Sequence, residues 1–140
     1  MNQVAILWPV GALAILTFVV LLIVPYRRFR AGYARRVRVE DFSYGESANV
    51  PGDVSLPNRN YMNLLESPNL FYVACIILYV THLVDAQAVW MAWLYVALRI
   101  VHTAVHVTYN KVRHRMLAFA GSIVVLVAFW IRLLVALGSA

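Results

Sequence analysis

The sequence predicts an all-α integral membrane protein, folded as a bundle of four transmembrane helices. Of its 140 residues, 63% are hydrophobic and only 13% are charged, against roughly 45–50% and 25% in ordinary soluble domains. Four stretches also reach the length of about 20 apolar residues that a helix needs to cross the hydrocarbon core. This composition excludes a soluble domain, and it excludes a disordered chain, which needs low hydrophobicity and high charge.

The first predicted span covers about residues 4–26 and contains no charged side chain. It ends at Pro25 and a basic cluster that begins with Arg27. We expect it to be retained as a span, because it is longer than the apolar region of a signal peptide and no basic segment precedes it. The residues from Arg27 to Arg38 are predicted to continue this helix as a basic extension.

The other three predicted spans cover about residues 62–84, 89–109 and 116–138. Only Asp85 to Ala88 separate the second span from the third, which predicts an antiparallel hairpin. The long connection, about residues 27–61, holds most of the glycines and prolines. The chain is therefore predicted to form a single domain over residues 1–140.

The basic residues lie mainly on one side of these spans. Lys and Arg number twelve, and ten of them flank two connections that share one membrane face, whereas the opposite face shows only Asp85. The positive-inside rule then places both termini on the non-cytoplasmic side. The same charges attract anionic membrane lipid, and nothing in the chain resembles a nucleic-acid-reading element. The ten residues are Arg27, Arg28, Arg30, Arg35, Arg36, Arg38, Arg59, Lys111, Arg113 and Arg115.

Ionisable residues within the spans are costly, so each needs a partner or a polar cavity. Arg59, Asn63 and Glu66 are spaced by four and three residues, which places them on one helical face. Arg99, His102 and His106 do the same on the third span. Two polar faces near one membrane surface predict a pocket for a small anionic or zwitterionic ligand.

Simpler interpretations compete with a ligand site. Glu66 is also explained by an ion pair with Arg99 or with Arg115. Arg132 is expected to snorkel outward or to pair with Asp85.

The two histidines have the spacing of a two-histidine metal site, but no third ligand follows as in metalloenzyme motifs, so no metal is expected. The single cysteine, Cys75, lies inside a span and is interpreted as a packing residue.

Two segments carry a family resemblance. The first reads Asn-Leu-Leu-Glu-Ser-Pro-Asn-Leu-Phe-Tyr over residues 63–72, with Arg59 four residues before it. The second reads His-Thr-Ala-Val-His-Val-Thr-Tyr-Asn over residues 102–110, with Arg99 before it and a basic run after it. With the four short spans, these segments resemble the bacterial branch of the MAPEG family, the membrane-associated proteins in eicosanoid and glutathione metabolism. The likeness spans essentially the whole chain.

The resemblance implies a homotrimer in the bacterial inner membrane that binds glutathione as a co-substrate between subunits near the cytoplasmic face. Arg59, Asn63 and Glu66 would contact the glutathione backbone, beside His102 and His106. One arginine of the first helix would reach a glutathione carboxylate. The candidates are Arg27, Arg28 and Arg30, and we expect this role for Arg30.

The same resemblance assigns the catalytic, thiolate-stabilising role to Arg115, with Arg113 as a competitor. Pro68, only two residues after Glu66, and His106, where related eukaryotic enzymes use tyrosine, depart from the family pattern, as does Tyr61. The leading hypothesis is a glutathione S-transferase-like enzyme or peroxidase that acts on lipophilic electrophiles or hydroperoxides. The alternative is a non-catalytic trimeric protein of the same fold that serves as a lipid-binding or interaction module.

Overall fold

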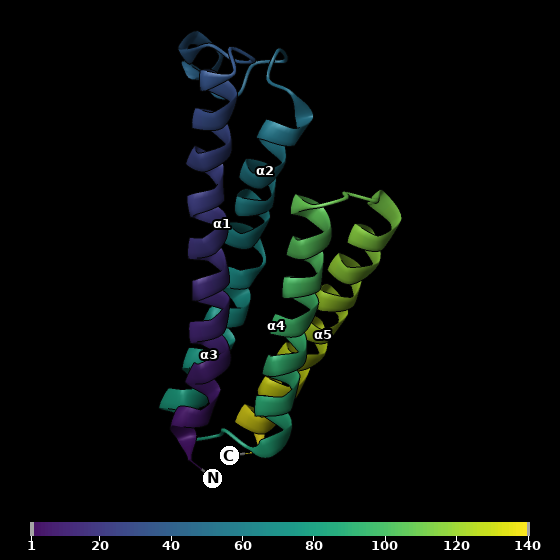
Figure 1. The fold of residues 1–140 in the computed structure, drawn as a ribbon. Helices are drawn as coiled ribbons and strands as arrows, with labels where there is room; N and C mark the ends of the chain where they lie inside the picture. Colours follow the sequence, from purple (N-terminus) through teal and green to yellow (C-terminus); the bar gives the residue numbers. More distant parts are fainter. Residues whose placement is uncertain (1, 140) are drawn as a thin grey trace.

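The computed structural model describes residues 2–139, and every regular element in them is helical (Figure 1). Four stretches, Gln3–Tyr33, Gly52–Val80, Ala86–Val107 and Val112–Gly138, are long and apolar enough to cross a membrane. The predicted fold class is confirmed. The elements are the short 3₁₀ helices η1 (Gln3–Ile6) and η2 (Val39–Phe42) and the α-helices α1 (Leu7–Tyr33), α2 (Gly52–Glu66), α3 (Pro68–Val80), α4 (Ala86–Val107) and α5 (Val112–Gly138).

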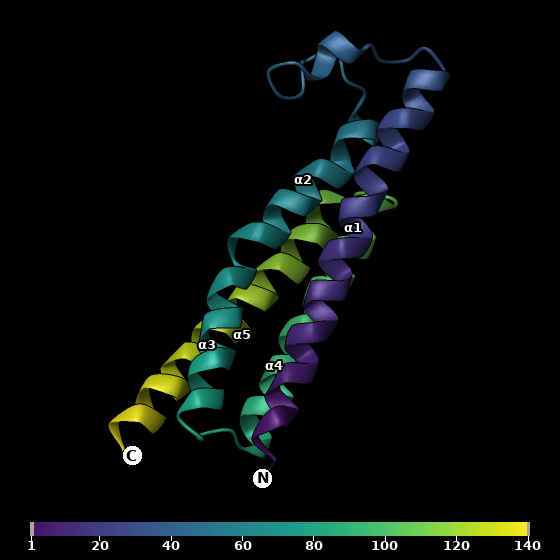
Figure 2. The ribbon, with the colours of Figure 1, turned by 90° about the vertical axis from the view of Figure 1, so that its left-hand side faces the viewer.

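The helices form two antiparallel groups (Figures 1 and 2). In one, α1 packs against α2 and α3, and in the other, α4 packs against α5. Both ends of the described chain lie at the same end of the bundle as the short α3–α4 connection. The α1–α2 and α4–α5 connections lie at the opposite end. The two termini therefore share one side, as predicted, and the assignment of that side as non-cytoplasmic stays a prediction from the positive-inside rule.

The core of the bundle consists of apolar and aromatic side chains and extends from the end that carries the termini to about the middle. Phe71 of α3 stacks on Tyr95 of α4 with ring centroids 4.7 Å apart, and Phe129 of α5 lies 6.1 Å from Phe71. Many large apolar side chains on the outer faces stay exposed, such as Leu22 and Leu134. An apolar exterior is stable only in lipid, so the packing agrees with a membrane location.

The first helix ends at Tyr33, so the prediction that it continues to Arg38 is wrong. Arg35 adopts a left-handed backbone with φ of 54°. Its N–H donates to the Gly32 carbonyl at 2.9 Å, and the Arg36 N–H donates to the Ala31 carbonyl at 2.9 Å. These two bonds form a Schellman motif, which satisfies the last carbonyls and turns the chain away from the helix axis.

The second membrane-crossing stretch starts at Gly52, ten residues before the predicted start of the second span at about residue 62. The predicted connection over residues 27–61 is therefore partly helical at both ends. Pro57 lies inside α2, and it has no N–H to donate to the carbonyl of Asp53. Arg27 replaces that donor: its Nη1 donates to the Asp53 carbonyl and its Nη2 to the Val107 carbonyl, both at 3.1 Å. This side chain joins α1, α2 and the end of α4.

A break at Ser67 separates α2 from α3, because Pro68 cannot donate to the carbonyl of Leu64. The side-chain amide of Asn69 donates to the Leu65 carbonyl at 2.6 Å and satisfies one of the freed acceptors. The position of Pro68, noted in the sequence as a departure from the family pattern, thus has a direct structural consequence. It ends the helix that carries Arg59, Asn63 and Glu66.

Two ion pairs hold the α1–α2 connection against the helices. Arg36 forms a bidentate pair with Asp53, with N–O distances of 2.8 and 3.0 Å, and the Asp53 carboxylate raises the pKa of Arg36. Arg28 bonds Glu46 at 2.9 Å and lies over the ring of Phe42, 4.7 Å from its centroid. Both arginines therefore have intrachain partners.

Asp41 organises the middle of this connection. Its carboxylate accepts from the backbone N–H of Arg38 and from the hydroxyl of Ser47, both at 2.9 Å. The bond from Arg38, followed by that from Ser47, lowers the pKa of Asp41. Hydrogen bonds to the ionised carboxylate favour that form.

At the opposite end of the bundle, Asp85 pairs with Arg132, which confirms one of the two predicted roles of this arginine. The other carboxylate oxygen of Asp85 accepts from the Ala88 N–H at 2.8 Å and caps the start of α4. One carboxylate thus links α4 to α5 and satisfies a free N–H of the first turn.

Candidate functional site

A pocket of about 480 Å³ lies among α2, α4 and α5, towards the end of the bundle that carries the basic connections. Most of the polar residues singled out in the sequence line it: Arg59 and Asn63 from α2, His102 and His106 from α4, and Arg115 from α5. The two polar faces predicted on separate spans therefore meet. Helical spacing places the polar residues of each element on one face, and the packing of α2 on α4 brings the faces together.

The two histidines form the buried wall of the pocket. Each is about 2% exposed, and their rings meet edge-on with centroids 5.5 Å apart. The Nδ1 of His102 lies 3.1 Å from the carbonyl oxygen of Arg115. Because a carbonyl only accepts, Nδ1 carries the proton and Nε2 of the neutral ring is an acceptor. That Nε2, and both ring nitrogens of His106, have no hydrogen-bond partner among the described residues.

Arg115 contributes a positive charge to the pocket beside the histidines. It lies in the first turn of α5, is partly buried, and donates to the side-chain oxygen of Asn110 at 2.7 Å. Asn110 has a left-handed φ of 45°, a conformation that asparagine tolerates better than most residues. Arg113, the competitor in the sequence, is exposed and does not line the pocket.

Arg99 lies beneath the pocket and is fully buried. Its Nη2 donates to the backbone carbonyl of Asn63 at 2.5 Å, and its guanidinium lies over the ring of Phe119, 5.5 Å from the centroid. The Asn63 carbonyl belongs to the last turn of α2, whose carbonyls lack intrahelical donors and carry the negative end of the helix dipole. Arg99 therefore supports the α2 terminus, and the predicted ion pair with Glu66 is absent from the described residues.

Two of the sequence candidates lie outside this pocket. Glu66 is exposed at the end of α2, and Arg30 is exposed on α1. Neither pairs with another described residue, and Arg115 bonds Asn110 instead of Glu66. The neighbouring Arg27 and Arg28 are occupied within the chain, which leaves Arg30 as the arginine of the three whose side chain faces outward.

The pocket also contains residues that the sequence reasoning missed. Asn58 adds a polar group one residue before Arg59, and the ring of Phe119 lies 5.6 Å from that of His102. Met62, Val112 and Met116 supply an apolar wall. Phe119 lies four residues after Arg115 and Met62 lies three residues after Arg59, so helical spacing from these two predicted residues was the available signal.

The fold and this site define a class: a multi-pass integral membrane protein with four spans and a polar, cationic pocket at one end of the bundle. A model of the MAPEG family matches residues 6–135, nearly the whole length. The chain belongs to the MAPEG family, a group of four-helix membrane proteins related to glutathione and eicosanoid metabolism. No curated protein and no solved structure matches the chain.

Proposed function

We propose that the protein is a glutathione-dependent transferase or peroxidase that acts on lipophilic electrophiles or hydroperoxides. Family membership supports this class, and the observation that carries the proposal is the pocket itself. It gathers two guanidinium groups, two buried imidazoles and two amides, a donor-rich set suited to a small peptide with two carboxylates and a thiol. Arginine is the preferred partner for carboxylates, because its planar donors match their geometry.

Arg115 is the proposed catalytic residue. An ordinary cysteinyl thiol has a pKa near 8.5 and is only a few per cent ionised at pH 7, whereas an adjacent guanidinium favours the thiolate. Arg115 keeps its charge at any physiological pH. The acceptor Nε2 of His102, fixed by the bond from Nδ1 to the Arg115 carbonyl, is proposed to take up the thiol proton. The thiolate sulfur then bonds the electrophilic carbon, and the leaving group departs with its electron pair.

Arg59 and Asn63 are proposed to hold the glutathione backbone. Glu66, which would pair with the ligand ammonium, and Arg30, which would reach a carboxylate, are exposed outside the pocket of the single chain. We therefore propose a homotrimer in which a neighbouring subunit completes the site with these outward-facing groups. The apolar wall of Met62 and Met116 would accept the lipophilic substrate from the bilayer. The proposed setting is the bacterial inner membrane, with the pocket at the cytoplasmic face.

The test is a titration of the purified protein with glutathione, followed by ultraviolet absorbance of the thiolate. We expect a thiolate signal that Arg115→Gln reduces to the few per cent expected of free thiol. Arg113→Gln is the matched control, because it removes an exposed charge from the same segment and should leave the signal unchanged. Loss of signal only in the Arg113 variant would move the role to that residue.

A second measurement separates catalysis from binding. Isothermal titration of Arg115→Gln should still show glutathione binding, since Arg59 and Asn63 remain. If the wild-type protein binds no glutathione and conjugates none of a panel of lipophilic electrophiles, the proposal fails. The non-catalytic module of the same fold would then be the better account.

A further inference from the structure

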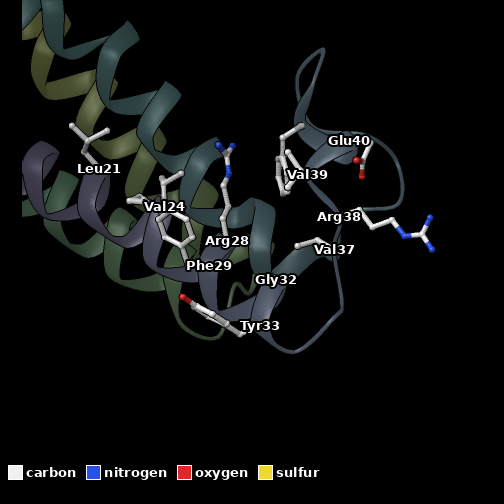
Figure 3. Close-up of a pocket in the computed structure, with 12 residues that line it drawn as sticks. Leu21, Val24, Arg28, Phe29, Gly32, Tyr33, Val37, Arg38, Val39 and Glu40 are labelled. Carbon is white, nitrogen blue, oxygen red and sulfur yellow. The ribbon is translucent and has the colours of Figure 1, made fainter.

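A second pocket, of about 950 Å³, shares no lining residue with the proposed active site. It lies at the basic end of α1, between that helix and the connection that follows it (Figure 3). Its walls are mainly apolar: Leu21, Val24 and Phe29 project from α1, and Val37 and Val39 from the connection, with Arg28 between them. Phe29 is 69% exposed and Val39 is 84% exposed, so the chain itself does not cover them.

A basic pocket of about 420 Å³ adjoins the apolar one. The two share the lining residues Val37, Arg38 and Glu40, so they lie side by side, and together they are called here the composite pocket. Arg35 and Arg36 line its polar part with Arg38. In Figure 3 the guanidinium of Arg38 points away from Leu21 and Val24. One side of the composite pocket is thus apolar and the other carries guanidinium groups.

The charges of the polar part are unequally engaged. Arg36 is bound to Asp53, and the carboxylate of Asp41 accepts from the Arg38 N–H and from Ser47. Arg35 and Arg38 form no ion pair within the described residues. Two guanidinium groups therefore lack an ion-pair partner among the described residues, and the acidic residues that line this part are Glu40 and Asp41.

The depth of the composite pocket matches the boundary between lipid chains and headgroups. Arg27 is bonded to the last carbonyl of α4, that of Val107, and so marks the level at which this membrane-crossing helix ends. Leu21 lies six residues before Arg27 and Tyr33 six residues after it, about 9 Å to each side at 1.5 Å per residue. The apolar wall near Leu21 is thus at acyl-chain depth, and the arginines are at headgroup level.

We propose that the composite pocket binds one anionic phospholipid, with an acyl chain along Leu21, Val24 and Phe29 and the phosphate between Arg35 and Arg38. Charge complementarity selects an anionic headgroup, and the uncovered apolar wall selects an amphiphile over a soluble anion. This proposal does not depend on glutathione chemistry, since the two pockets are separate. Bound lipid would hold the connection against α1 from its outer side.

The test uses the full-length protein, stripped of lipid in a neutral detergent and titrated with dioleoyl phosphatidylglycerol or dioleoyl phosphatidylcholine. Native mass spectrometry counts the lipids bound per chain. We expect one tight phosphatidylglycerol per chain and weaker phosphatidylcholine binding. A basic residue near an anionic surface contributes about a fivefold factor, so Arg35→Gln with Arg38→Gln should weaken phosphatidylglycerol binding by about 25-fold at low salt.

Two further variants sharpen this test. Glu40→Gln removes the opposing charge and should tighten phosphatidylglycerol binding by about fivefold. Lys111→Gln with Arg113→Gln is the matched control, because it removes two exposed charges at the same end of the bundle outside the composite pocket; lipid binding should be unchanged. Equal binding of the two lipids, or an equal loss in the control, overturns the proposal.

Photocrosslinking locates the lipid. Phosphatidylglycerol with a diazirine on its acyl chain should label peptides from residues 21–42. Labelling confined to other segments overturns the proposal. A bifunctional maleimide that joins two copies of Val39→Cys in the lipid-saturated protein would instead show that a second chain covers this face, and would also overturn it.

Discussion

Replacing Arg27 with methionine is expected to loosen the junction of α1, α2 and α4. Methionine keeps a similar length and an apolar stem but donates no hydrogen bond. Two carbonyls then lose their donor: that of Asp53, freed by Pro57 inside α2, and that of Val107 at the end of α4. The change tests whether this arginine supplies donors that the helices lack.

The magnitude follows from the two bonds. A hydrogen bond from a charged donor contributes about 1.5–3 kcal/mol. The bond to Asp53 is exposed and the bond to Val107 is partly buried, so we take about 1 kcal/mol for the first and about 1.5 kcal/mol for the second. Arg27→Met should therefore lower the free energy of unfolding by about 2–3 kcal/mol.

A double-mutant cycle isolates the part due to Pro57. In Pro57→Ala the residue regains an N–H that can donate to the Asp53 carbonyl, so the bond from Arg27 becomes partly redundant. Arg27→Met should then cost about 1 kcal/mol less than it does in the wild-type background. Arg30→Met is the control, since it removes an exposed charge from the same helix.

The single cysteine provides the assay. Cys75 is fully buried in α3, so its reaction with a fluorogenic maleimide reports unfolding as sodium dodecyl sulfate is titrated into micelles of the protein. Additive effects of the two substitutions, within about 0.3–0.5 kcal/mol, would refute the argument that Arg27 replaces the missing donor. An equal loss in Arg30→Met would show that charge alone is responsible.

Three further predictions concern two helix ends and the α1–α2 connection. Asp85→Ala should destabilise the protein by about 1–2 kcal/mol through loss of the α4 cap and the pair with Arg132, whereas Asp85→Asn keeps the cap and should cost less than about 1 kcal/mol; equal losses in the same assay would contradict the capping role. His82 has a left-handed φ of 58°, so His82→Gly should raise stability by about 1 kcal/mol, while Thr81→Gly, at an ordinary φ of −86°, should lower it; a destabilised His82→Gly would count against backbone strain. The pKa of Asp41 is lowered in the folded protein from its ordinary 3.8, so its stabilisation is complete above that value and is lost as the pH falls through the folded pKa. As the pH falls through that range, the amides of residues 38–47 should lose protection from hydrogen exchange. Asp41→Asn should abolish this dependence of protection on pH. An unchanged pH profile in that variant would assign the dependence to another titrating group.

Much of the fold was predictable because lipid imposes a simple rule. A chain in the hydrocarbon core must satisfy its own backbone groups, so uncharged stretches of sufficient length become helices. The class, the four spans and the shared side of the termini followed from that rule. The residues at which helices begin and end did not follow from it. The left-handed turn at Arg35 and the start of α2 at Gly52 lie in polar sequence, where no periodic pattern of apolar residues indicates a helix.

The candidate site was predictable as two separate helical faces. Spacing along the sequence places Arg59 and Asn63 on one helical face and His102 and His106 on another. Only the packing of α2, α4 and α5 brings these two faces around one pocket with Phe119. The partner of Arg99 was also beyond the sequence. Its charge suggested an ion pair with Glu66. In the folded chain Arg99 donates to the backbone carbonyl of Asn63 instead, because α2 ends before Pro68 and its last carbonyls need a donor.

The sequence by itself determined that this is a four-span membrane protein and which polar residues share a helix face, since both depend on spacing along one chain. Only the tertiary structure decided which faces meet and which arginines are already occupied. Arg27, Arg28 and Arg30 look equivalent in sequence, yet two of them are bound within the chain and Arg30 is exposed. The physical reason is that a side chain's partner is set by distances between helices, which local sequence does not encode.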